Sequence, residues 1–92
     1  MPVLRKGNDM KILYFAWVRQ KTGIAEEDVE PPAEVATVAD LIEWLRGRGP
    51  EFAHAFEDLR VIRAAVDQVH AQPDTAIGDA REIAFFPPVT GG

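Results

Sequence analysis

The end of the chain carries the group best suited to chemistry, a carboxyl on a glycine. Gly91 and Gly92 have no Cβ, so the backbone of another protein can approach them closely. The preceding Pro87 and Pro88 have a fixed φ and no N–H, so they cannot continue a sheet ladder and favour an extended exit. At ~3.3 Å per residue, the residues after Pro88 reach about 13 Å. We therefore expect residues 87–92 to form an extended, flexible arm that presents the Gly92 carboxylate to the narrow active site of a partner.

The remainder of the sequence offers little other chemistry. A frayed end would explain Gly-Gly alone, but it does not need Phe-Phe-Pro-Pro in front of it. The chain has no cysteine, which excludes disulfides, thiolate zinc sites and persulfide chemistry on it. His54 and His70 have no metal-site spacing, and no Walker, GxGxxG or GxSxG motif is present. We expect no metal site and no self-contained active site, with His54 a helix-surface residue.

Length and composition indicate one small domain. A chain of 92 residues that is 47% hydrophobic can build a single core. The net charge of -5 argues against binding to nucleic acid and is compatible with a basic partner or simply with solubility. Without an 18-residue apolar run or a signal-peptide core, we expect a cytoplasmic protein that does not enter membranes.

The N-terminal half predicts two strands and two helices. Residues 1–9 lack periodicity and are expected to be a disordered leader before Met10. Residues 11–18 are rich in branched and aromatic side chains and predict a strand, with Phe15 on an apolar face that a partner buries. A loop at 19–25 turns at Gly23. The remaining predictions are an edge strand at 26–35 broken by its prolines, a helix with Thr37 as its N-cap and Asp40 in its first turn, and a short helix at 51–56. The first of these helices is expected to end at Gly47 and Gly49.

The C-terminal half predicts three strands, at 61–66, 69–71 and 82–86, with turns at 67–68 and 78–79. The complete order predicts an α+β, β-grasp (ubiquitin-like) domain over residues 10–86. Its mixed sheet of four to five strands would be covered by one main helix and a short helix. The apolar first and last strands are expected to be parallel neighbours at the sheet centre. This pairing would bring Phe15 close to Phe86 on the helix-free face, with Phe85 and Ile83 in the core.

Three segments resemble a known family. They are KILYFAWVRQKTG at 11–23, AAVDQ at 64–68 and the closing GDAREIAFFPPVTGG. They are similar to the small, sulfur-carrying subunits of molybdopterin synthase, the MoaD family, in the ubiquitin-like MoaD/ThiS superfamily that includes the thiamine carrier ThiS. The resemblance covers residues 10–92, and its most specific part is the closing motif. The leader is extra, and Asp67 stands where many relatives carry Asn.

The resemblance implies a mechanism in which the chain is a substrate of one enzyme and a subunit of another. An E1-like adenylating enzyme would use ATP to activate Gly92, and sulfur would then give a thiocarboxylate. The large subunit of molybdopterin synthase, in a heterotetramer, would pass this sulfur to a cyclic pyranopterin precursor in molybdenum cofactor biosynthesis. This chain would bind no cofactor, and the catalytic residues would belong to its partners. The expected partner-binding residues are Phe15, Phe86, Pro87, Pro88, Val89, Thr90 and Gly91.

Other functions remain compatible with the same tail. An activated C-terminal glycine can acylate a lysine, which would make the chain a ubiquitin-like protein modifier. A carrier could also deliver sulfur to thiamine, cysteine or tRNA. A passive β-grasp interaction module is a third alternative, but it gives no role to the Gly-Gly end.

Overall fold

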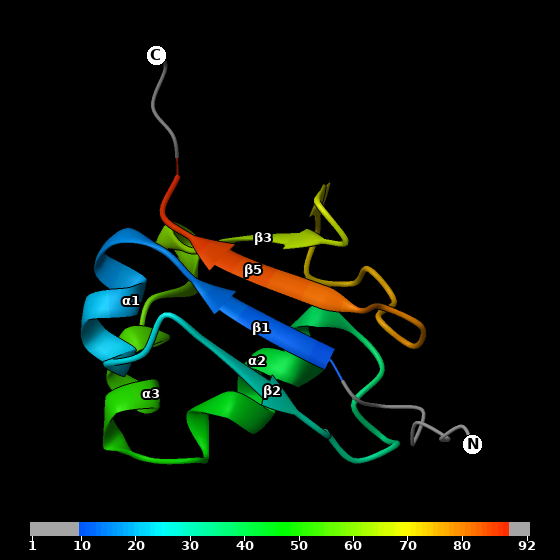
Figure 1. The fold of residues 1–92 in the computed structure, drawn as a ribbon, viewed down its shortest axis with the longest axis horizontal. Helices are drawn as coiled ribbons and strands as arrows, with labels where there is room; N and C mark the ends of the chain where they lie inside the picture. The colour runs from blue at the N-terminus through cyan, green and yellow to red at the C-terminus, as the bar shows by residue number, and fades with distance from the viewer. Residues whose placement is uncertain (1–9, 89–92) are drawn as a thin grey trace.

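The computed structural model describes residues 10–88, which form a five-stranded mixed sheet with its main helices packed behind it in the view of Figure 1. The strand order is β2-β1-β5-β3-β4. The strands are β1 (Met10–Tyr14), β2 (Glu26–Val29), β3 (Arg63–Val66), β4 (Val69–Ala71) and β5 (Glu82–Phe86). The helices are α1 (Ala16–Thr22), α2 (Val38–Arg46) and α3 (Pro50–Ala55), with a 3₁₀ turn, η1, at Leu59–Val61.

The predicted pairing of the terminal strands is confirmed. β1 and β5 are parallel neighbours, with Ile12 opposite Ile83 and Tyr14 opposite Phe85. β5 is the central strand of the sheet, since β3 pairs antiparallel with its other side. β2 lies at one edge, as expected, but it ends at Val29 rather than continuing to residue 35. The two most apolar strands therefore occupy the most protected positions.

The prediction of a strand at 11–18 followed by a loop was wrong beyond Tyr14. Ala16 adopts a φ of 54°, a conformation that a strand does not contain, and α1 follows from there. Val18 and Thr22, four positions apart, are both buried, because they form the inner face of this helix. Gly23 ends the helix in the left-handed conformation, with a φ of 85° and its N–H donating to the Arg19 carbonyl. The sheet is thus accompanied by three α-helices in the described chain, rather than the two predicted.

The predicted start of α2 is confirmed. The Thr37 side chain accepts from the Asp40 N–H, and the Asp40 carboxylate accepts from the N–H groups of Ala36 and Thr37. The hydrogen bond from the Ala36 backbone is the main cause that holds the pKa of Asp40 below its usual value. Gly47 caps the other end of the helix as predicted, whereas Pro50 begins α3.

A tight turn joins β3 to β4. Asp67 and Gln68 have φ values of 49° and 73°, the pair of positive angles that a type I′ hairpin turn requires. The Asp67 Oδ1 also accepts from the N–H groups of Arg81 and Glu82, each at 2.9 Å. The predicted turn is therefore confirmed, and its first residue anchors the start of β5. The strand predicted at 61–66 begins at Arg63, because η1 occupies the residues before it.

Aromatic side chains fill the core beside the terminal strands. Phe85 is fully buried, with its ring centroid 6.3 Å from that of Tyr14 and 5.1 Å from that of Phe56. Phe52 is also buried, 6.3 Å from Tyr14. The predicted pairing of Phe52 and Phe56 on one side of the short helix is consistent with this cluster. None of the helices described in residues 10–88 is long and apolar enough to span a bilayer.

A polar network connects β2 to the α2–α3 junction. The Tyr14 hydroxyl donates to Glu27 Oε2 at 2.8 Å, and the Arg48 guanidinium donates to both Glu27 oxygens at 2.7 and 2.9 Å. Burial, followed by the hydrogen bond to the Glu27 carboxylate, raises the pKa of Tyr14 well above its usual value. Arg48 also lies over the Phe52 ring, 5.0 Å from its centroid. The edge strand is thus held to the helical layer by charge-assisted hydrogen bonds.

Candidate functional site

The candidate site begins where β5 ends. Phe86 is opposite Arg63 on β3, and on the other side of β5 the Phe15 N–H donates to the Phe85 carbonyl at 3.0 Å. Pro87 and Pro88 continue from this point and are half-buried. The predicted sites Val89, Thr90, Gly91 and Gly92 lie outside the described residues, and their roles stay predictions. The described structure thus fixes the root of the predicted arm on the central strand.

Phe85 and Phe86 face opposite sides of the sheet, as predicted. Phe85 lies in the core under the helices, while the half-buried Phe86 lies on the helix-free face. The Phe86 ring contacts the His70 ring, with centroids 6.3 Å apart. Sequence reasoning missed His70. The predicted hairpin could have indicated it, because pairing His70 with Ala65 places it on the same face as Phe86.

Phe15 is exposed, but its position differs from the prediction. The residue is 48% accessible, and it lies at the N-cap of α1 rather than within a strand. Its backbone is still extended, with φ −123° and ψ 154°, and it contacts the Phe85 carbonyl. Phe15 and Phe86 therefore both lie where the chain leaves the sheet, while the Phe86 ring contacts a side chain from β4. Their predicted role in partner binding stays a prediction.

The helix-free face carries a row of small and aliphatic side chains next to Phe86. Leu13, Ala84 and Ala65 are aligned across β1, β5 and β3 by the strand register. Because Ala65 and Ala84 have short side chains, little projects from this part of the face, and a partner backbone can approach the sheet closely. We define the open-face patch as Leu13, Ala65, Ala84 and Phe86. Its apolar character, at the root of the tail, is typical of a protein-binding surface.

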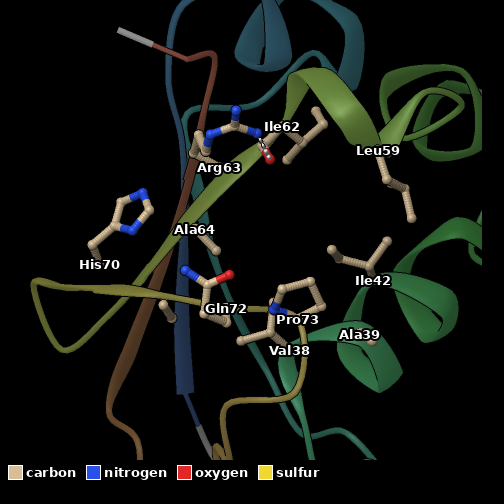
Figure 2. Close-up of a pocket in the computed structure, with 11 residues that line it drawn as sticks. Val38, Ala39, Ile42, Leu59, Ile62, Arg63, Ala64, His70, Gln72 and Pro73 are labelled. Atoms are coloured by element: carbon tan, nitrogen blue, oxygen red, sulfur yellow. Dashed lines mark hydrogen bonds between the residues drawn. The ribbon is translucent and has the colours of Figure 1, made fainter.

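A second concave region lies on the other side of the sheet. A pocket of about 430 Å³ lies between α2, η1 and the β3–β4 hairpin, and Figure 2 draws the residues that line it. Its walls are mainly apolar and include Val38, Ile42, Leu59, Ile62 and Pro73. In Figure 2, the His70 ring points away from the apolar walls, on the far side of the strands.

The chemistry of this pocket is limited by its lining. Apart from His70, whose ring points away, its polar residues are Arg63 and Gln72, and Arg63 Nη1 donates to the carbonyls of Arg60 and Ile62 at 3.1 and 3.2 Å. The lining contains no carboxylate, thiol or hydroxyl, so it offers no nucleophile with an adjacent base. Within residues 10–88, no cluster of three or more His, Cys, Asp or Glu side chains could hold a metal ion. The tail root and the open-face patch therefore remain the candidate site.

Comparisons with known proteins give matches over nearly the whole chain. The model of the ThiS family matches residues 12–92. The molybdopterin synthase sulfur carrier subunit of Escherichia coli (strain K12) is 39% identical over 83 residues, which cover 90% of this chain and 99% of the relative. The subunit of the same name from Haemophilus influenzae is 34% identical over 83 residues, with the same coverage.

Solved structures show the same fold. A putative molybdopterin converting factor, subunit 1, from Pyrococcus furiosus is 34% identical, with a TM-score of 0.70 over 88% of this chain and 98% of that chain. SAMP1 from Haloferax volcanii, a small archaeal modifier protein, is 28% identical, with a TM-score of 0.70 over 91% of this chain and 99% of that chain. These neighbours confirm the predicted ubiquitin-like β-grasp architecture.

Proposed function

The chain belongs to the ThiS family, with molybdopterin synthase sulfur carrier subunits among its relatives, and from this premise we propose that it carries sulfur on Gly92. The observation that carries the proposal is the extent of the family match, which continues to residue 92 and so includes Gly91 and Gly92. The described part of the chain supports it, because β5 ends at Phe86 and the chain leaves the sheet at Pro87 and Pro88. In this proposal the terminal carboxyl carries the sulfur, and the folded domain presents it to partners.

The proposed chemistry converts a carboxylate into a thiocarboxylate. A Gly92 carboxylate oxygen attacks the α-phosphorus of ATP, which forms an acyl adenylate and releases pyrophosphate. A sulfur nucleophile then attacks the glycyl carbonyl, the C–O bond to AMP breaks, and sulfur takes the place of one oxygen. Since the chain has no cysteine, its terminal carbonyl is the natural place for it to hold sulfur. Transfer of that sulfur to an acceptor restores the carboxylate once water supplies the oxygen.

The proposal includes two protein partners. An E1-like adenylating enzyme supplies the ATP site, and the large subunit of molybdopterin synthase, in a heterotetramer, supplies the residues that transfer sulfur to the pyranopterin precursor. Both must hold the same tail, so both are expected to use the open-face patch at its root. This chain contributes no bound cofactor to either step. We place these reactions in the cytoplasm, where ATP is available.

Intact mass spectrometry tests the carrier function. The chain is purified after co-expression with an adenylating enzyme and a sulfur donor, and a fraction should be heavier by one oxygen-to-sulfur exchange at the C-terminal residue. A Gly92-deleted chain is the matched control and should show no heavier fraction. Exchange that persists in the control, or a normal chain that never gains sulfur under these conditions, contradicts the proposal.

A second candidate function is protein modification, which the similarity to SAMP1 favours. In that function the adenylated Gly92 acylates a lysine on another protein. Isopeptide adducts on several unrelated proteins would support it, whereas a defined complex with one synthase subunit supports the carrier. The family match does not distinguish thiamine, cysteine or tRNA as sulfur acceptors. Supplying each acceptor to the thiocarboxylated chain and following loss of its sulfur would distinguish them.

A further inference from the structure

The two lysines of the described chain have different surroundings. Lys11 is paired with carboxylates, its Nζ lying 3.4 Å from Glu26 and 3.8 Å from Asp28. Lys21 instead has its Nζ 3.1 Å from the Nε2 of His54. The ammonium of Lys21 also lies 5.3 Å from the centre of the Trp17 ring. One lysine is therefore next to carboxylates, and the other is next to a base.

The packing of α1 against α3 creates this second arrangement. Lys21 is in the last turn of α1, and His54 is in the last turn of α3. These two helices are in contact, and Val18 of α1 and Phe52 of α3 are buried, while Lys21 and His54 are exposed. In Figure 1, the end of α1 and α3 lie next to each other at the left of the molecule. A large acyl donor can therefore reach the amine from solvent.

We propose that Lys21 is an acyl-acceptor site, with His54 as the base that takes its proton. The distance between nucleophile and base, 3.1 Å, is within the hydrogen-bond range of activated nucleophiles. A neutral imidazole whose Nε2 carries the lone pair is the tautomer that accepts from Lys21. The Trp17 ring lies beside the Lys21 ammonium and restrains the side chain.

Acylation of Lys21 requires one class of acyl donor, an activated carboxyl such as an acyl adenylate. Attack requires the neutral amine, whose first proton is lost to water. The Lys21 nitrogen then forms a bond to the carbonyl carbon, His54 accepts the second proton, and AMP leaves with the electrons of the C–O bond. The natural donor rests on the proposed function, because it is the adenylated Gly92 of this chain or of a second copy. Acylation consumes the carboxyl that carries sulfur, so Lys21 would compete with sulfur for the same intermediate.

A chemical probe tests the site without any partner enzyme. The full chain is treated near neutral pH with a limiting amount of N-hydroxysuccinimidyl acetate, and peptide mass spectrometry follows acetylation of Lys21 and Lys11. We expect Lys21 to react about tenfold faster than Lys11, less than the ~10²–10⁴ of enclosed active sites because this site is open to water. In the His54→Gln variant, the excess rate at Lys21 should disappear while Lys11 is unchanged. Equal rates at the two lysines, or an excess that persists in His54→Gln with an unchanged thermal melt, overturn the proposal.

A second, enzymatic experiment identifies the source of the acyl group. The chain is incubated with ATP and an adenylating enzyme, with Lys21→Arg as the matched control. Monomer that has lost one water, linked at Lys21, identifies the chain's own tail as donor, and a covalent dimer linked at Lys21 identifies a second copy. A conjugate that forms equally in Lys21→Arg overturns the site. If no pyrophosphate is released, the proposed function fails. Acetylation by N-hydroxysuccinimidyl acetate still decides whether Lys21 is activated.

Discussion

Tyr14 and Phe85 are directly opposite each other in the parallel register of β1 and β5, and their rings stack with centroids 6.3 Å apart. This contact joins the first strand to the strand that leads into the tail. The next residue, Phe86, faces the other side of the sheet. Of these two adjacent phenylalanines, one therefore lies in the core and the other on the helix-free face.

Replacing these two phenylalanines should give opposite results. Phe85→Ala opens a cavity beside Tyr14 and Phe56 and should lower the free energy of unfolding by ~3–5 kcal/mol. Phe86→Ala should cost less stability, because this side chain is half-buried. It should weaken binding to both proposed partners by ~2 kcal/mol, as expected for an aromatic side chain at the centre of an interface. Thermal melts and partner titrations of both variants separate the two roles, and reversed results would show that the open-face patch is not the binding surface.

The tail glycines should be required for function but not for folding. Deleting Gly92, or adding a residue after it, should abolish sulfur loading with an unchanged thermal melt, since no described core residue comes from the tail. Gly91→Ala adds one methyl group and should slow turnover if a narrow channel holds the tail. Normal turnover in Gly91→Ala would mean that the partner's channel accepts side chains.

Tyr14 should make the protein less stable at high pH. Its folded-state pKa is raised above the unfolded value of about 10, so the folded form retains the proton while the unfolded chain loses it. The stabilisation is therefore complete below pH ~10 and declines as pH rises above it, by up to ~1.4 kcal/mol per pH unit. Denaturant unfolding at several pH values should show this decline, and it should be absent in Tyr14→Phe.

The Tyr14→Phe variant also provides a reference at neutral pH. Loss of the hydrogen bond to Glu27 should cost about 1.5 kcal/mol, because the acceptor is charged but keeps its bonds to Arg48. Tyr14 is the only tyrosine, so its ultraviolet absorbance reports ionisation directly. Ionisation of the folded protein near pH 10 would contradict the buried hydrogen bond.

Asp67 should tolerate replacement by Asn but not by Ala. Asn can adopt the positive φ of 49° and keeps an Oδ1 that can accept from the N–H groups of Arg81 and Glu82. Asp67→Asn should change stability by less than ~0.5 kcal/mol, whereas Asp67→Ala should cost ~2 kcal/mol through lost hydrogen bonds and strain. Chemical denaturation of the pair measures the difference. A large loss in Asp67→Asn would show that the negative charge itself is needed.

Local signals predicted much of this fold correctly. The capping residues of α2, the turn at 67–68 and the apolar terminal strands each carry information within a few positions, and each was confirmed. α1 was missed because its N-cap, Phe15, makes no side-chain capping bond and its apolar residues continue those of β1. The four-residue spacing of Val18 and Thr22, followed by Gly23, was the sequence signal that could have identified this helix.

The candidate site could be predicted only in part from local sequence signals. The alternation of Phe85 and Phe86 gave the correct faces, because side-chain direction in a strand follows from sequence alone. The contact between Phe86 and His70 depends on a hairpin pairing, and the contact between Lys21 and His54 depends on how two helices pack. Such contacts join residues distant in sequence, and no local pattern specifies them.

The central position of β5 also determines how the molecule responds to force. A pull on the tail acts along β5, whose hydrogen bonds to β1 and β3 lie across the direction of pull on both sides. These bonds are loaded in shear and must break together, whereas an edge strand such as β4 can be peeled away one bond at a time. A partner that binds and pulls the terminal residues would therefore not unfold the domain. The domain is a mechanically stable support for the group at the end of the chain.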